Sequence, residues 1–289
     1  MQKGQKSMST NSGMRGEWPR NGHNRRAAEM TDPPAMVRVR FHRFLPYWAV
    51  LQTDLRQTSQ GWLFVLWIGL MLVGICGFYL YRVGLQQEAG LVQSAAVLCA
   101  EALRATFLGS LAVVVILSVA AIGTERGTVA DAILSRGISR HQYFLARQHA
   151  RMILVGVVFA LVSTGIIAVG SLLFRGGEAD ISFRGAAVVI ALLSLLLAVV
   201  AAVGVVLGAI TNSTILGIAL YWLLLYGGGL LLMLAPETWP TPERELSRLR
   251  YVLQGYYSSA YYGRIALTAA AVACAATVWG LIGFSRKDV

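Results

Sequence analysis

The chain has 289 residues, of which 56% are hydrophobic and only 13% are charged. This composition excludes an ordinary soluble domain, whose surface needs about twice that share of charged residues. The net charge of +11 does not indicate nucleic-acid binding, because the basic residues follow the loops between apolar segments, as in a membrane protein.

Residues 1–36 are rich in Ser, Asn, Gly, Pro and Arg, which predicts a disordered cytoplasmic tail. They contain no apolar core of a signal peptide, so we expect the first membrane span to act as the insertion signal. Met30 and Met36 are alternative start positions.

Residues 37–60 predict an amphipathic helix at the cytoplasmic membrane surface, with arginines among apolar residues at near-helical spacing. The apolar positions are Phe41, Phe44, Leu45, Trp48, Leu51 and Leu55. Separate interfacial anchors without a continuous helix are the alternative.

Residues 61–289 predict six transmembrane helices, so the expected fold class is an all-α membrane protein. Crossing a bilayer takes about 20 apolar residues, and six stretches approach or exceed that length without a charge. They lie near 61–81, 105–122, 152–174, 186–210, 215–235 and 265–284. Because uncharged spans leave no residue to bind a coupling ion, an ion-driven carrier is disfavoured.

The distribution of the 25 lysines and arginines predicts the orientation in the membrane. Ten precede Gly61, five lie between the second and third spans, two follow Phe284, and the outer loops hold eight. Since basic loops stay in the cytoplasm, we expect a multi-pass plasma-membrane protein with both termini cytoplasmic.

The stretch TERGTVADAILSRGISRHQYFLAR, residues 124–147, is the main polar loop between spans. Thr128 and Asp131 resemble a capping box, which predicts a short helix from near Val129 to around position 136. A helix of about eight residues is unstable alone in water. Its apolar face, which includes Ile133, must therefore rest on the membrane surface or in a cleft of another protein.

A second capping box follows in the same loop, formed by Ser139 and Gln142, with Ile138 and Tyr143 spaced as a hydrophobic staple. These residues predict a helix that continues through Arg147 into the third span. The arginines of the loop either contact a partner or serve only as positive-inside anchors.

The last outer loop, 236–263, predicts a helix of its own. Pro242 suits a first helical position, Glu243 and Glu245 suit the first turn, and Gly255 lies near the expected end. Its tyrosines are typical of an interfacial belt. Earlier, Gly204 and Gly208 form a GxxxG motif, which predicts close helix packing within the chain or across a dimer.

No catalytic motif, P-loop or metal-ligand spacing is present in the sequence, so we expect no catalytic residue, no metal and no cofactor in this chain. Scattered hydroxyls in the spans suit a lipid-like or amphipathic cargo, although such hydroxyls usually bond to their own helix. They belong to Ser110, Ser118, Ser163, Thr164, Tyr221 and Tyr226.

The polar loop resembles the cytoplasmic loop of type-2 (ABC-2-like) ABC transporter permeases. The matching residues are Glu125, Gly127, Thr128, Leu134, Ser135, Ile138, Ser139 and Arg140, and the terminal FSRKDV is also similar. Two positions depart from the family pattern, because Gly137 stands where a proline is common and Arg147 where a lysine is common.

This resemblance implies a permease subunit of an ATP-driven exporter in a prokaryotic plasma membrane, working as a homodimer or permease pair. The 124–147 loop would dock on a separate cytoplasmic ATPase subunit, which binds the ATP. The expected docking residues are Glu125, Gly127, Thr128, Val129, Ile133, Arg136 and Arg140. A membrane scaffold that recruits a cytoplasmic partner without transporting anything is the alternative.

Overall fold

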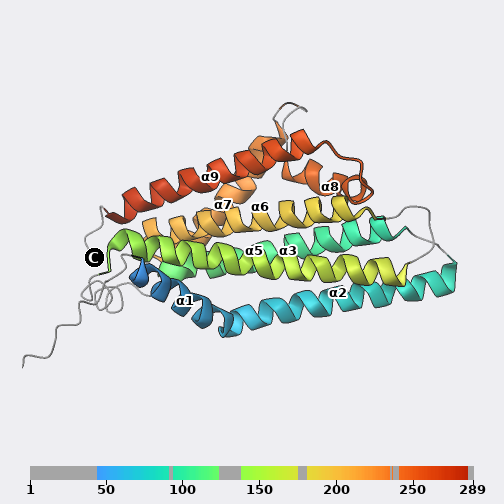
Figure 1. Ribbon diagram of the computed structural model, residues 1–289, viewed down its shortest axis with the longest axis horizontal. Coiled ribbons are helices and arrows are strands. Elements are labelled where there is room, and N and C mark those ends of the chain that lie inside the picture. Colours follow the sequence, from blue (N-terminus) through green and yellow to red (C-terminus); the bar gives the residue numbers. More distant parts are fainter. Residues whose placement is uncertain are drawn as a thin grey trace, which may run out of the picture. The chain divides into compact units, whose positions relative to one another are not determined.

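The computed structural model describes residues 44–90, 94–123, 138–174, 181–234, 236 and 241–285. In this part of the chain, all regular secondary structure is helical, which confirms the all-α class (Figure 1). The predicted tail, 1–36, and the short loop helix lie outside the described residues.

Six of the helices are long and apolar enough to cross a membrane. They are α2 (Trp62–Ala89), α3 (Ala95–Gly123), α5 (Arg140–Leu173), α6 (Phe183–Ile210), α7 (Thr214–Met233) and α9 (Ser259–Ser285). Two shorter helices accompany them, α1 (Leu45–Ser59) and α8 (Pro242–Leu253). All six predicted spans are therefore found, and each lies largely within one of these helices.

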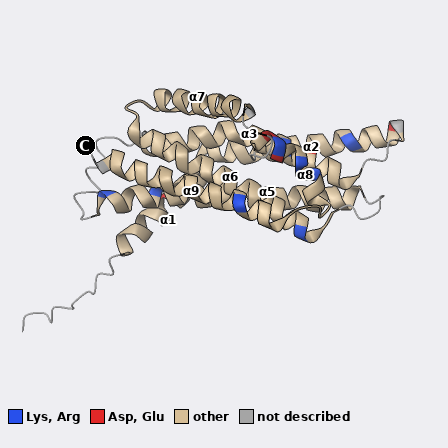
Figure 2. Ribbon diagram, turned by 90° about the horizontal axis from the view of Figure 1, so that it is seen from above, with Lys and Arg blue, Asp and Glu red and all other residues tan. Residues whose placement is uncertain are grey.

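Several membrane helices extend beyond the uncharged stretches in the sequence. Arg82 and Arg104, which the sequence analysis assigned to outer loops, lie within α2 and α3. Arg82 forms an ion pair with Glu101 of α3. The connection between these helices is short, because charged residues near a helix end keep their backbone hydrogen bonds and still reach the headgroup region. Figure 2 shows the few charged residues against the mostly uncharged ribbon.

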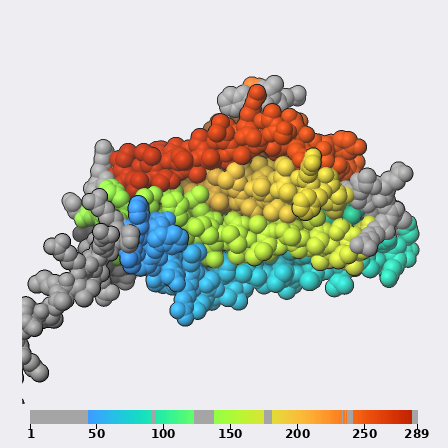
Figure 3. Space-filling view, in the orientation of Figure 1, coloured from blue at the N-terminus to red at the C-terminus, as the bar shows by residue number. Residues whose placement is uncertain are grey.

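Helix α6 is the centre of the bundle and packs against α3, α5, α7, α8 and α9. Figure 3 shows α9, α6, α5 and α2 lying along one another on one face. Gly204 and Gly208 bring α6 against α3, where a Cβ on Gly208 would collide with the carbonyl oxygen of Val119. The GxxxG motif thus serves packing within the chain.

The helix predicted between residues 236 and 263 is confirmed. Helix α8 begins at Pro242 with Thr241 as its N-cap residue, and it buries Leu246, Leu249 and Leu253 on one face. Its last turn is tied to the start of α6, because the Ser182 amide donates to the Leu253 carbonyl at 2.7 Å. Figure 1 shows that α8 and α1 lie towards opposite ends of the bundle.

Candidate functional site

Helix α1 lies along the first turns of α5. Leu51 is buried against Ala146 and Ala150 of α5. The Tyr47 hydroxyl and His149 Nδ1 share a hydrogen bond of 3.0 Å, and burial raises the pKa of the Tyr47 phenol, so it stays neutral at physiological pH. α1 is therefore attached to protein as well as available to a membrane surface.

The residues that α1 exposes and buries differ from the predicted amphipathic pattern. Phe44, Leu45 and Trp48 are exposed, as a helix that contacts lipid requires. Leu51, expected on the same face, points instead at α5, while Asp54 is buried. The reason is that small alanines on α5 let the α1 backbone approach closely enough to cover both residues.

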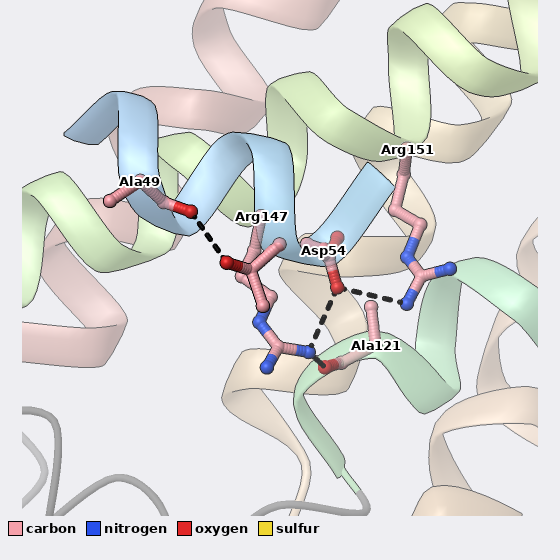
Figure 4. A network of polar contacts seen from close by, with 6 residues as sticks. Ala49, Asp54, Ala121, Arg147 and Arg151 are labelled. Atoms are coloured by element: carbon pink, nitrogen blue, oxygen red, sulfur yellow. Dashed lines mark hydrogen bonds and ion pairs between the residues drawn. The ribbon is translucent and has the colours of Figure 1, made fainter. Parts of the chain in front are cut away.

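A buried ionic cluster joins the two helices (Figure 4). Asp54 Oδ1 lies 3.2 Å from Arg147 Nη1 and 3.4 Å from Arg151 Nη2. The Asp54 residue is only 2% exposed, and the two arginines are 6% and 9% exposed. Arg147 and Arg151 are one helical turn apart on α5, so both can reach one carboxylate on α1.

Arg147 also connects this cluster to α3. Its Nη1 donates to the Ala121 carbonyl at 2.9 Å, near the last residue of that helix. A helix carries partial negative charge on its final carbonyls. At the end of α3, this charge helps to balance the positive charge of Arg147. The guanidinium carbon lies 5.2 Å from the ring centroid of Tyr143. One side chain thus contacts α1, α3 and its own helix.

The end of α9 is packed beside this ionic cluster. Phe284 lies against Tyr143 and Phe144, with ring centroids 6.5 Å and 5.9 Å away. A Cβ on Gly280 would collide with the Phe144 ring. We name the set Asp54, Ala121, Tyr143, Arg147 and Arg151 the α1–α5 joint. It links α1, α3 and α5 through the contacts of Arg147.

The predicted docking residues are only partly described. Glu125, Gly127, Thr128, Val129, Ile133 and Arg136 lie outside the described residues, between the end of α3 and the start of α5. Arg140 is the first residue of α5 and is partly buried. The structure therefore describes the two helix ends that flank the predicted docking loop, the end of α3 and the start of α5.

The second capping box of that loop is confirmed. The Ser139 hydroxyl accepts from the Gln142 amide at 3.2 Å, and the Gln142 side chain accepts from the Ser139 amide at 3.4 Å. Ile138 packs with Tyr143 in one apolar cluster, as a staple requires. The capping box therefore fixes the residue at which α5 begins, and with it the position of Arg147 opposite α1.

Asp54 was missed by the sequence analysis, which treated the arginines of the loop, Arg147 among them, as either partner contacts or membrane anchors. The signal was the pair of arginines four residues apart among small residues that fit a helix interface.

Three expected hydroxyls behave as predicted, since Ser110, Ser118 and Thr164 donate to carbonyls of their own helices. Within the described ranges, no cluster of three His, Cys, Asp or Glu could hold a metal ion.

Comparisons of the sequence with models of known protein families and with curated proteins gave no match.

Proposed function

We propose that this chain is the permease subunit of an ATP-driven transporter, with a separate ATPase subunit docked on residues 124–147. The α1–α5 joint is the observation that supports this function most directly. It lies where the loop leaves α3 and enters α5, because Arg147 of α5 donates to the Ala121 carbonyl of α3 and pairs with Asp54 of α1.

Such a joint suits the transfer of force from a soluble motor to membrane helices. A push on the loop moves the end of α3 and the start of α5 together, since Arg147 holds them. Asp54 carries the movement to α1, and the packing of α6 carries it into the rest of the bundle. Two permease copies in one complex, with substrate leaving the cell, complete the proposal by resemblance to type-2 permeases.

The test of this function begins with purification of the chain from its native membrane in mild detergent. We expect an ATPase subunit to co-purify, and we expect its ATP hydrolysis to change when the permease is present. Recovery of a cytoplasmic partner without ATPase activity would favour the scaffold alternative and contradict the transporter.

Two substitutions in the loop test the docking role. Ile133→Asp places a charge on the predicted apolar face, and Gly127→Pro alters the predicted bend. Both are expected to reduce co-purified ATPase at least tenfold while the chain still inserts at normal abundance, measured by quantitative immunoblotting of membranes. Glu88→Gln, at an exposed residue of α2 outside the loop, is the control. Normal ATPase recovery with both variants would overturn this docking site.

A further inference from the structure

A groove at the α8 end of the bundle is not used by the proposed docking mechanism. It lies between α3, α7 and the first turn of α8, and its volume is about 540 Å³. This is within the range of roughly 300–1,000 Å³ that is typical of small-molecule sites. Its floor and walls are mostly apolar, with contributions from Leu108, Leu111, Leu225 and Leu232.

Two opposite charges line this apolar groove. Arg104 comes from α3 and Glu243 from the first turn of α8, and both are exposed. Neither forms a hydrogen bond or an ion pair with another residue in the described ranges. A guanidinium and a carboxylate that share a groove without pairing with each other are available to a ligand that carries both charges.

Arg104 also lies at a suitable depth for a lipid headgroup. It follows the first residue of α3, Ala95, by nine positions, a rise of about 14 Å along the helix. Arg104 directly precedes the uncharged stretch 105–122 of α3. At about 1.5 Å per residue this stretch is about 27 Å long, close to the hydrocarbon core of about 30 Å, which puts Arg104 near the boundary between acyl chains and headgroups. Arginine at that depth pairs readily with phosphate.

The start of α8 provides a second feature for an anion. Thr241 lines the groove, is only 5% exposed, and its hydroxyl does not cap the helix. This hydroxyl also makes no hydrogen bond to any described residue. The first amides of a helix have no acceptor within it and favour phosphate. The hydroxyl of Thr241 and the start of α8 therefore lie on the same groove as Arg104.

Aromatic side chains form another part of the groove wall. The rings of Trp222 and Tyr226 are stacked with centroids 5.4 Å apart. Tryptophan and tyrosine are enriched at the level of lipid headgroups, and their ring faces attract ammonium groups. This wall complements the positive part of a zwitterionic headgroup, as the Glu243 carboxylate does.

From these features we infer that the groove binds a zwitterionic phospholipid of the phosphatidylethanolamine type. Its phosphate is held by Arg104 and the Thr241 hydroxyl, and its ammonium group is directed to Glu243. The acyl chains lie along the leucines named above. A phospholipid with a purely anionic headgroup fits less well, because Glu243 repels it. This inference does not depend on the proposed function, since binding requires neither an ATPase nor transport.

The test uses the full-length chain reconstituted into bilayers that contain phospholipids with brominated acyl chains, which quench nearby tryptophan fluorescence. The Trp222→Phe variant identifies the share of the signal that Trp222 contributes. We expect brominated phosphatidylethanolamine to quench Trp222 at a several-fold lower mole fraction than brominated phosphatidylglycerol. Equal quenching by both lipids would overturn the proposed headgroup selectivity.

Variants that each remove one charge test which residue binds the phosphate and which residue binds the ammonium group. Arg104→Gln should weaken both lipids about tenfold, as expected for loss of a charge-assisted phosphate contact. Glu243→Gln should abolish the preference for phosphatidylethanolamine while leaving phosphatidylglycerol binding equal or stronger. The exposed residues Arg264 and Glu88 provide matched controls, Arg264→Gln and Glu88→Gln, which should change neither curve.

A soluble competitor separates a lipid site from a phosphate site. Glycerophosphoethanolamine, which has the headgroup without acyl chains, should not relieve the quenching at concentrations that match the lipid. Efficient competition by this compound would contradict the lipid proposal. Unchanged quenching in Arg104→Gln, with the same thermal unfolding midpoint as the wild type, would also overturn it.

Discussion

Among the described residues, Asp54 supplies the carboxylate of the ionic cluster, and it contacts two buried arginines, Arg147 and Arg151. Its removal therefore takes away the carboxylate that both buried guanidinium groups contact. Removal of Arg151 leaves a neutral pair of Asp54 and Arg147. The structure thus predicts unequal effects for substitutions that break the same ion pair.

We expect Asp54→Asn to lower the free energy of unfolding by about 3 kcal/mol or more, the usual cost of breaking a buried pair. Arg151→Gln should have a clearly smaller effect. The measurement is the thermal unfolding midpoint of the purified chain in detergent. Arg56→Gln, on the exposed side of α1, is the control. Equal midpoints for Asp54→Asn and Arg56→Gln would contradict the buried cluster.

Sequence patterns predicted the start of α5 but not this cluster, for a physical reason. Ser139 and Gln142 act within one helical turn, so local spacing reveals their capping bonds. Asp54 and Arg151 are separated by 97 positions, and their contact depends on how α1 packs. Spacing along one helix could show that two arginines share a face, but not which carboxylate meets them.

At the scale of whole elements, α3 and α6 approach each other closely. Gly208 lies so close to the Val119 backbone that a methyl group has no space. The sequence motif predicted a close helix contact, and the structure identifies α3 as the contacting helix. Helix ends were predicted less well than helix centres, because the charged ends of α2 and α3 remain helical.

Gly208→Ala should therefore destabilise the bundle, by about 1–3 kcal/mol as is typical of overpacked cores. The matched control is Gly165→Ala on α5, where a Cβ meets no atom within 4 Å. This control should be neutral or slightly stabilising, since alanine favours the helix. Unfolding midpoints in the same detergent compare the two variants, and equal destabilisation would argue against an α3–α6 contact.

At the scale of the whole molecule, the main prediction concerns orientation. The α5 start and the α8 end lie at opposite ends of the bundle (Figure 1). The basic residues counted in the sequence predict that the first of these ends faces the cytoplasm. The two ends should therefore react differently with a reagent that cannot cross the membrane.

Cysteine labelling tests this orientation. The exposed native cysteines, Cys76 and Cys274, are first replaced by alanine, while Cys99 is buried. In that background, Tyr256→Cys should be labelled from outside intact cells, because Tyr256 is 76% exposed. Ser139→Cys should react only after the membrane is permeabilised. The reverse pattern would invert the orientation and remove the proposed docking loop from the cytoplasm.

The distance in sequence between the partners of the ionic cluster also sets an order for biogenesis. Asp54 leaves the ribosome 97 residues before Arg151, a delay of roughly 5–20 s at ordinary rates of synthesis. During that time α1 has no α5 to pack against and its carboxylate remains hydrated. Helix α1 must therefore dock after the third membrane span has been delivered, so a chain stalled before that point displays an unassembled α1 to quality-control proteases.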